Sequence, residues 1–268
     1  MKKKFKFGVI GAGFMSTAII KGVIGSNLLK EKEIIVSDIN QNSLKTISNL
    51  GVNTTMDNKY LADNCEFLMF AIKPQNAPEV LCDIKNCNCD KFISIMAGVK
   101  KAKIKSYFPN SCVARCMPNT PCAIGSGAVG IDLSDFNNEK DIMFVKTLFS
   151  SLANVVILQE NELNAVTGIS GSSPAYFYLF LKGIIDAGVK HGLRLEDSKL
   201  LATSTMIGAG KMVLENPDKS LDDLITAVCS KGGTTIEAIN IFNEQNLNSI
   251  TESAINACVK RSMELENS

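Results

Sequence analysis

The chain has 268 residues, of which 46% are hydrophobic and 21% charged, and its formal net charge is +1. This length allows one large domain or two modest ones, and the composition excludes a disordered chain, a coiled coil and a nucleic-acid-binding surface. No window of the sequence approaches the length of a transmembrane span, so we expect no membrane partner.

The chain contains nine cysteines and one histidine, His191. An odd number of cysteines without an export signal is typical of reduced thiols in the cytoplasm, where we expect the protein. None of the cysteine spacings is the paired C-x-x-C of zinc sites, so we expect no metal. The lysine-rich start resembles the first part of a signal peptide, but glycines and hydroxyl residues break the apolar run after it, and we expect no signal peptide.

The first predicted elements are a strand over residues 6–10, a glycine turn and a helix that ends near residue 25. Gly11 permits a tight turn, Gly13 lets the backbone approach a pyrophosphate, and Ser16 is small enough for close helix–strand packing. A second strand over residues 33–38 ends at Asp38, whose carboxylate can accept hydrogen bonds from an adenosine ribose. The alternative is an aspartate with a purely structural role at the end of a strand.

Strands and helices continue to alternate up to residue 160. We predict helices at residues 41–50, 100–107 and 138–151, and strands at 52–54, 66–72, 91–96, 112–117, 127–131 and 155–158. Such alternation implies a parallel sheet with ligands at the carboxyl ends of its strands. Polar or glycine-rich turns follow several of these predicted strands, at Gly11, Ser37, Lys73, Ala97 and Asn119.

The remainder of the chain is predicted to be helical, at residues 162–190, 195–215, 221–228, 235–243 and 247–265. The predicted fold class is therefore α/β, with a Rossmann-type parallel-sheet domain at residues 1–160 and an all-helical domain at residues 161–268. Residues 176–181 are apolar nearly all round, which favours burial in an isologous dimer. The alternative is a central helix that is buried within its own chain.

The segment between two of these predicted helices combines adjacent glycines with hydroxyl side chains, at residues 229–235. Gly232 and Gly233 let backbone N–H groups point outward, and the helix that follows adds the positive end of its dipole. Thr234 and Thr235 supply hydroxyls, so the segment suits a small anion such as a carboxylate. The alternative is a simple helix corner with Thr234 as N-cap.

The residues that the chain lacks also bear on its chemistry. A nucleotide domain implies a hydride carrier, but there is no second histidine for a His–carboxylate pair. Pro174 stands three residues after Gly171, where hydroxyacid dehydrogenases of this two-domain plan are expected to carry a lysine. A protonated imine needs orientation more than a strong acid, so the pattern favours reduction of a cyclic imine that bears a carboxylate.

Six segments, in their order and spacing, resemble the pyrroline-5-carboxylate reductase family: residues 7–16, 71–75, 97–99, 115–121, 167–176 and 228–238. The resemblance extends over essentially the whole chain, and residues 167–176 and 229–235 are its most specific parts. It implies the last step of proline biosynthesis, a hydride transfer from NAD(P)H to L-1-pyrroline-5-carboxylate that gives L-proline. It also implies homodimers, which in this family often assemble into decamers through the helical domain.

The resemblance assigns roles to the matching positions. It implies that the pyrophosphate is cradled by Ile10, Gly11, Ala12, Gly13, Phe14 and Met15, and that the adenosine end meets Ser37, Asp38 and Asn58. The nicotinamide side would be lined by Ile72, Lys73 and Ala97, with Asn119 close by. The substrate carboxylate would be held by Ser230, Gly232, Gly233 and Thr234, with Thr235 as the catalytic hydrogen-bond partner of the ring nitrogen and Glu160 near the pocket.

Three departures from the family pattern are Lys231 for a usual proline, Ser173 for a usual glycine and Thr226 for a common aspartate. No arginine follows the second strand, and Asp38 would repel a 2′-phosphate, so the sequence favours NADH over NADPH. Two rival hypotheses remain: an enzyme that reduces another imine or a β-hydroxyacid, and a non-catalytic nucleotide-binding regulator.

Overall fold

The computed structural model describes residues 3–266, and the chain divides into two compact units. The first unit contains the residues up to 172 together with those from 258 onward, and the second contains residues 173–257. By their contacts, residues 161–172 and the end of the last helix belong with the sheet. These units therefore do not coincide with the predicted domains 1–160 and 161–268, and that division stays a prediction.

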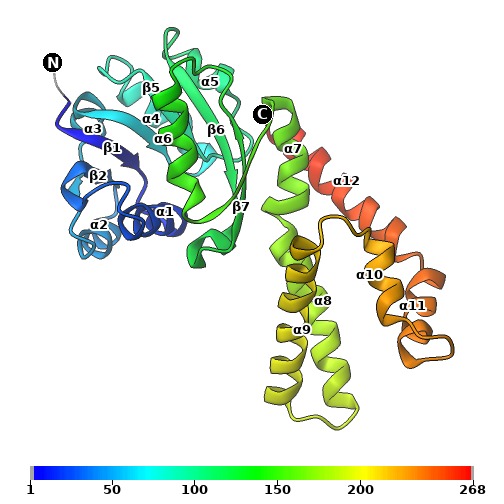
Figure 1. Cartoon of the computed structure of the whole chain (residues 1–268). Helices are drawn as coiled ribbons and strands as arrows, with labels where there is room; N and C mark the ends of the chain where they lie inside the picture. Colours follow the sequence, from blue (N-terminus) through cyan, green and yellow to red (C-terminus); the bar gives the residue numbers. More distant parts are fainter. Residues whose placement is uncertain (1–2, 267–268) are drawn as a thin grey trace. The chain divides into compact units, whose positions relative to one another are not determined.

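The first unit is built on an eight-stranded sheet in the order β3-β2-β1-β4-β5-β6-β7-β8 (Figure 1). Its strands are β1 (Phe5–Ile10), β2 (Ile34–Ser37), β3 (Asn53–Thr55), β4 (Cys65–Phe70), β5 (Lys91–Ser94), β6 (Cys112–Pro118), β7 (Gly127–Asp132) and β8 (Ala153–Ile157). From β1 the strands are added first toward β3 at one edge and then, from β4 onward, toward the other edge. The position between β1 and β4 is therefore the topological switch point, where such sheets bind dinucleotides. The predicted Rossmann-type α/β fold class is confirmed.

One strand pair departs from the predicted parallel sheet. β7 runs antiparallel to β6, while every other neighbouring pair of this sheet is parallel. The link between them holds only the short 3-10 helix η3 (Thr120–Ile124), which is too short for the crossover that a parallel pair requires. The predicted parallel arrangement is therefore wrong for the pairing of β6 with β7.

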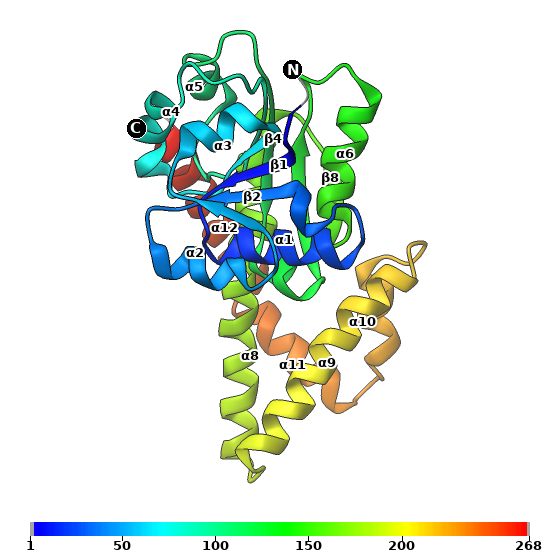
Figure 2. The ribbon, with the colours of Figure 1, turned by 90° about the vertical axis from the view of Figure 1, so that its left-hand side faces the viewer.

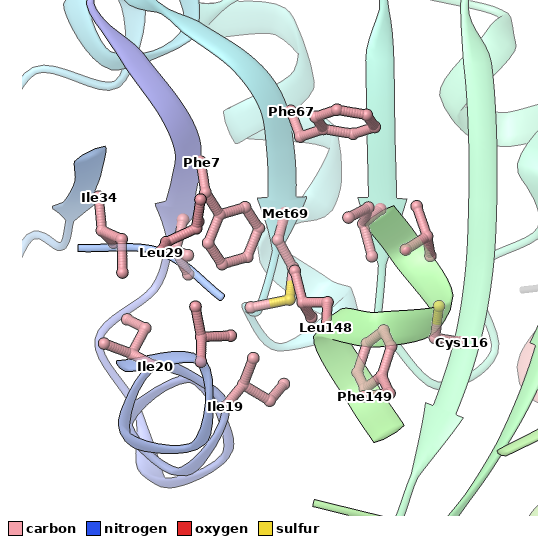
Figure 3. Packing of buried hydrophobic residues seen from close by; sticks show 14 of the residues in the cluster. Phe7, Ile19, Ile20, Leu29, Ile34, Phe67, Met69, Cys116, Leu148 and Phe149 are labelled. Carbon is pink, nitrogen blue, oxygen red and sulfur yellow. The ribbon is translucent and has the colours of Figure 1, made fainter. Parts of the chain in front are cut away.

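Helices cover both faces of the sheet (Figure 2). One face packs on α1 (Phe14–Gly25), α2 (Gln41–Ser48) and α6 (Glu139–Ser150), and the other packs on α3 (Asn58–Asn64), α4 (Ala77–Asp83) and α5 (Lys101–Lys105). Figure 3 shows Phe7 and Met69 of adjacent strands beside Ile19 of α1 and Phe149 of α6. They belong to the core on one face, and a second apolar cluster buries the other face, as a parallel sheet requires.

Short 3-10 helices and a π-helical turn complete the first unit. They are η1 (Glu31–Glu33), η2 (Pro74–Asn76), η4 (Glu160–Glu162) and the π-helical turn η5 (Thr167–Gly171), which follows α7 (Leu163–Val166). The π-helical turn lies just before Pro174, whose missing N–H group and fixed φ favour a kink or a restart of the helix. The long helix α8 indeed restarts at Ser173.

The second unit consists of helices only: α8 (Ser173–Lys190), α9 (Leu195–Glu215), α10 (Leu221–Val228), α11 (Thr234–Glu244) and the first part of α12 (Leu247–Glu266). α8 and α9 form a helical hairpin (Figure 1). In the single chain, Phe177, Tyr178 and Leu179 are 57%, 63% and 74% exposed. The alternative of a central helix buried within its own chain is therefore wrong, and the exposed apolar surface is typical of a subunit interface.

Several helices begin at a residue whose side chain caps their free N–H groups. Such capping bonds occur at Asn40 of α2, Asp57 of α3, Asn138 of α6 and Ser220 of α10. Helices α1 and α11 begin instead at Gly13 and Gly233, which cannot cap through a side chain. The first-turn N–H groups of these two helices are thus free of side-chain caps, and both lie in the segments predicted to bind anions.

Candidate active site

The glycine turn between β1 and α1 has the geometry that a dinucleotide requires. Gly11 has a φ of 106°, and a Cβ atom there would lie 2.4 Å from the carbonyl oxygen of Ala71. Gly13 is exposed, and a Cβ atom there would meet no atom within 4 Å. Gly11 is therefore required by the fold, whereas the open space at Gly13 lets a phosphate approach the start of α1.

Asp38 is bound to the same turn. Its carboxylate accepts a hydrogen bond from the N–H of Ala12 at 2.7 Å and another from the N–H of Asn40 at 2.8 Å. Asp38 thus joins the end of β2 to the glycine turn, as the structural alternative in the sequence analysis requires. This does not exclude a ribose contact, since each carboxylate oxygen can accept more than one hydrogen bond.

The predicted cofactor residues gather along the carboxyl edge of the sheet. Ile10 lies opposite both Ser37 of β2 and Phe70 of β4, and Phe70 lies opposite Ser94 of β5. The Ser37 hydroxyl donates a hydrogen bond of 2.7 Å to the side chain of Asn58. The ends of β1, β2, β4 and β5 therefore meet at one edge, and this geometry fits a dinucleotide.

Residues that follow β4 and β5 extend this edge. Ile72 lies against Gly11. Lys73, which follows β4, and Ala97, which follows β5, are both exposed. An open pocket of about 570 Å³ adjoins the start of α1, where Phe14 is 66% exposed; its lining is formed by Ala12, Gly13, Phe14, Thr17, Ala18, Lys21, Asn42, Ser43, Thr46 and Ala123. That Ile72, Lys73 and Ala97 contact a cofactor stays a prediction.

Asn119 is buried, and its side chain is engaged by the protein. Its amide nitrogen donates to the carbonyl oxygen of Ser170 at 3.2 Å, and its Oδ1 accepts from the N–H of Ala128 at 3.0 Å. Asn119 therefore ties the end of β6 to β7 and to the π-helical turn. Its predicted place near the nicotinamide remains untested by these contacts.

Glu160 is held by two donors at one oxygen. Its Oε1 accepts from the N–H of Lys101 at 2.7 Å and from the guanidinium of Arg115 at 3.3 Å. Arg115 also bonds Glu266 at 2.7 Å, and both Arg115 and Glu266 have buried side chains. The sequence analysis missed Arg115 and Glu266, although a charged residue inside an apolar strand such as β6 is a signal of a specific partner.

The lysines of the helix predicted at residues 100–107 differ in their exposure to solvent. Lys101 is buried and forms ion pairs with Asp132 at 2.9 Å and with Asp135 at 3.0 Å. Lys105 pairs with the same Asp135 at 3.0 Å. Burial would raise the pKa of Asp135, but hydrogen bonds from Lys105 and Lys101 lower this pKa below its ordinary value.

The predicted substrate loop lies in the second unit, between α10 and α11. Gly232 has a φ of 69°, which favours glycine, and a Cβ atom at Gly233 would lie 2.2 Å from the Ser230 hydroxyl oxygen, so the Ser230 side chain would have to move. The N-cap of α11 is Gly233, and the alternative with Thr234 as N-cap is wrong. Thr235 is the second residue of the helix and is half-buried, so its hydroxyl lies near the uncapped first turn.

Residues 3–266 lack the features of a metal site and of a membrane span. No group of three or more His, Cys, Asp or Glu side chains in this range is arranged to hold a metal ion. In the same part of the chain, no helix has both the length and the hydrophobicity needed to cross a membrane. All nine cysteines are free thiols.

Comparisons with known proteins cover nearly the whole chain. A family model described as pyrroline-5-carboxylate reductase dimerisation matches residues 160–265, and one described as NADP oxidoreductase coenzyme F420-dependent matches residues 6–98. The chain is 36% identical over 261 residues to the pyrroline-5-carboxylate reductase of Haemophilus influenzae, with 96% of each chain covered.

Solved structures give the same result. A pyrroline-5-carboxylate reductase from Coxiella burnetii matches with a TM-score of 0.90 and 29% identity, over 98% of this chain and 99% of that chain. Plasmodium falciparum pyrroline carboxylate reductase with NADP bound matches with a TM-score of 0.87 and 28% identity, over 99% and 100% of the two chains. Because full-length relatives are more than 30% identical to it, this chain belongs to the pyrroline-5-carboxylate reductase family.

Proposed function

We propose that this protein reduces L-1-pyrroline-5-carboxylate to L-proline with a hydride from NAD(P)H. The observation that carries the proposal is the match with reductases of this name along nearly the full length of both chains. The open glycine turn at the switch point of the sheet supports a dinucleotide as the hydride source.

The cofactor would lie along the carboxyl edge of the sheet. The N–H groups at the start of α1 would bind its pyrophosphate, with Gly13 giving the space for close approach. Ser37 and Asn58 would meet the adenosine end, while Ile72 and Ala97 would line the nicotinamide side. When bound, the reduced nicotinamide supplies the hydride.

The substrate carboxylate would be bound at the uncapped start of α11. Ser230, Gly232, Gly233 and Thr234 would contribute N–H and hydroxyl groups, and the helix dipole would favour the anion. Thr235 would hydrogen-bond the ring nitrogen and so orient the imine. Because a protonated imine already carries its proton, hydride addition to its carbon leaves the amine of proline without a further acid.

For the coenzyme, we propose a preference for NADH. The carboxylate of Asp38 lies at the end of β2, where it would repel a 2′-phosphate, and no arginine follows it in the segment up to Asn40. The relative from Plasmodium falciparum was solved with NADP bound, so use of both coenzymes is compatible with this fold. We also propose a cytoplasmic homodimer, with the decamer as a higher assembly.

The test is the initial rate of NADH and NADPH oxidation by the purified protein with pyrroline-5-carboxylate. We expect turnover, with a higher kcat/KM for NADH than for NADPH. A higher value for NADPH would remove the role given to Asp38. A folded protein that binds nucleotide and turns over neither this imine nor a panel of other imines and β-hydroxyacids would favour the regulator instead.

A further inference from the structure

Arg115 is a buried cation in the middle of β6 that pairs with two carboxylates from distant parts of the chain. Its side chain is 6% exposed, and its two terminal nitrogens lie 3.3 Å from Glu160 Oε1 and 2.7 Å from Glu266 Oε1. The sequence separations are 45 and 151 residues. A cation so far from water needs such partners, and Arg suits the task because its planar group can serve two acceptors at once.

The last turn of α12 is joined to the rest of the first unit by more than this ion pair. Glu266 also lies 3.4 Å from Lys100 Nζ, and the Ser262 hydroxyl donates a hydrogen bond of 2.6 Å to the side chain of Asn164. Burial would raise the pKa of Glu266, but hydrogen bonds from Asn164 and Arg115 lower this pKa, so the carboxylate is held ionised.

The same helical turn also contacts the turn that follows β5. Gly98 has a φ of 71°, and a Cβ atom there would lie 3.0 Å from the Cβ of Leu265. Both its backbone conformation and the close approach of α12 therefore favour glycine at this position. Two residues further on, Lys100 pairs with Glu266, and the N–H of Lys101 binds Glu160.

Residues 97–101 are thus held from two sides by one connected group of charges. Ala97, at the start of this segment, is exposed at the carboxyl edge of the sheet, where the nicotinamide end of the cofactor is proposed to lie. We propose that Arg115 and Glu266 are positioning residues, which through Lys100 and Glu160 hold the turn at residues 97–101 in place for the coenzyme. This inference rests on the proposed dinucleotide site, but it assigns a role in coenzyme binding to the last turn of the chain's final helix.

The test compares Glu266→Gln with the matched control Glu264→Gln in the full-length protein. Glu264 lies in the same helical turn, but its side chain is 48% exposed and pairs with Arg261. We would measure kcat, the KM of each substrate, and the dissociation constant of NAD⁺ by calorimetry. Removing the charge of Glu266 should raise both the coenzyme KM and the NAD⁺ dissociation constant about 10-fold, the effect of one charged hydrogen bond. The KM for pyrroline-5-carboxylate and all constants of Glu264→Gln should stay unchanged.

Two results for Glu266→Gln would overturn the inference. One is a coenzyme KM and an NAD⁺ dissociation constant equal to those of the wild type. The other is a lower kcat with both of these constants unchanged, because this pattern means that Glu266 has no part in coenzyme binding. If the variant does not fold, Lys100→Met decides in its place, since it removes the more exposed partner of the same carboxylate. The calorimetric comparison remains decisive even if the wild type fails to reduce pyrroline-5-carboxylate, so the two proposals fail separately.

Discussion

Gly11 and Gly13 lie two residues apart in one turn, yet a methyl group added at each would meet different surroundings. At Gly11 it would lie 2.4 Å from the Ala71 carbonyl oxygen, in a backbone conformation with a φ of 106°. At Gly13 it would meet no atom of the protein within 4 Å. The first glycine therefore serves the fold, and the second is proposed to serve the ligand.

This difference predicts opposite outcomes for two alanine variants. Gly11→Ala should lower the melting temperature by several degrees, since the strain is of order 1–3 kcal/mol. Gly13→Ala should lose at most about 1 kcal/mol at its helix cap but should weaken NAD⁺ binding roughly 10-fold or more. Calorimetry and thermal unfolding of both variants check this. Wild-type affinity in Gly13→Ala would show that no phosphate approaches there.

Thr235 carries the most direct chemical prediction at the scale of single residues. Thr235→Ala should lower kcat/KM for pyrroline-5-carboxylate by roughly 10- to 1000-fold, the effect of one oriented hydrogen bond. Thr235→Ser keeps the hydroxyl and should retain most of the activity. Steady-state kinetics of the two variants decide the matter, and equal turnover by Thr235→Ala and the wild type would remove Thr235 from the mechanism.

At the scale of elements, two ionised carboxylates stabilise the first unit. Asp135 pairs with Lys101 and Lys105 of α5, and Glu266 pairs with Arg115 of β6 and with Lys100. In each case burial acts to raise the pKa, and hydrogen bonds and cations lower it overall, below its ordinary value. The carboxylates of Asp135 and Glu266 are therefore harder to protonate in the folded protein than in the unfolded chain.

This direction fixes the sign of a pH dependence. The contribution of the two carboxylates to stability is fully present above their ordinary pKa values of about 3.9 and 4.3, and it is lost as the pH falls through the lower values of the folded state. The melting temperature should therefore decrease as the pH is lowered below about 4.5. Asp135→Asn should reduce this fall, because the variant has no carboxylate to protonate there. A pH profile of Asp135→Asn parallel to that of the wild type would contradict the assignment.

At the scale of the whole molecule, the helical unit cannot bury its own apolar side chains. Leu179, Leu200 and Leu214 are 74%, 68% and 71% exposed in the single chain. Helices α10 and α11 contain no buried residue at all. Such a surface needs a partner, and the match of residues 160–265 to a dimerisation model supports a second copy of the chain.

A charge placed on this surface should prevent assembly. Leu179→Glu should raise the dissociation constant of the oligomer at least about 100-fold, because burial of an unpaired carboxylate costs several kcal/mol. Lys190→Glu puts the same side chain at the exposed end of α8 and serves as the control. Light scattering across a dilution series measures both variants, and an unchanged mass for Leu179→Glu would exclude this face from the interface.

The parts of the fold that follow from neighbouring residues could be predicted from the sequence. The glycine turn after β1 lies where the pattern indicates, and β2, β4 and β5 end within one or two residues of their predicted ends. Each depends on local steric preferences or on the period of apolar residues over a few turns. Because parallel strands share one carboxyl edge, these local features were enough to gather the candidate cofactor residues.

Features that depend on the path of the whole chain could not be predicted from the sequence. Three examples are the antiparallel direction of β7, the burial of Lys101 and the pairing of Arg115 with Glu266. Each depends on contacts between segments that are distant in the sequence, and the local pattern of one segment does not indicate the other. The amino-acid sequence by itself determined the alternating α/β plan, the glycine turn and the loop at residues 229–235. Only the tertiary structure decided which charges meet, since a pair separated by 151 positions forms only after the sheet and the last helix have packed together.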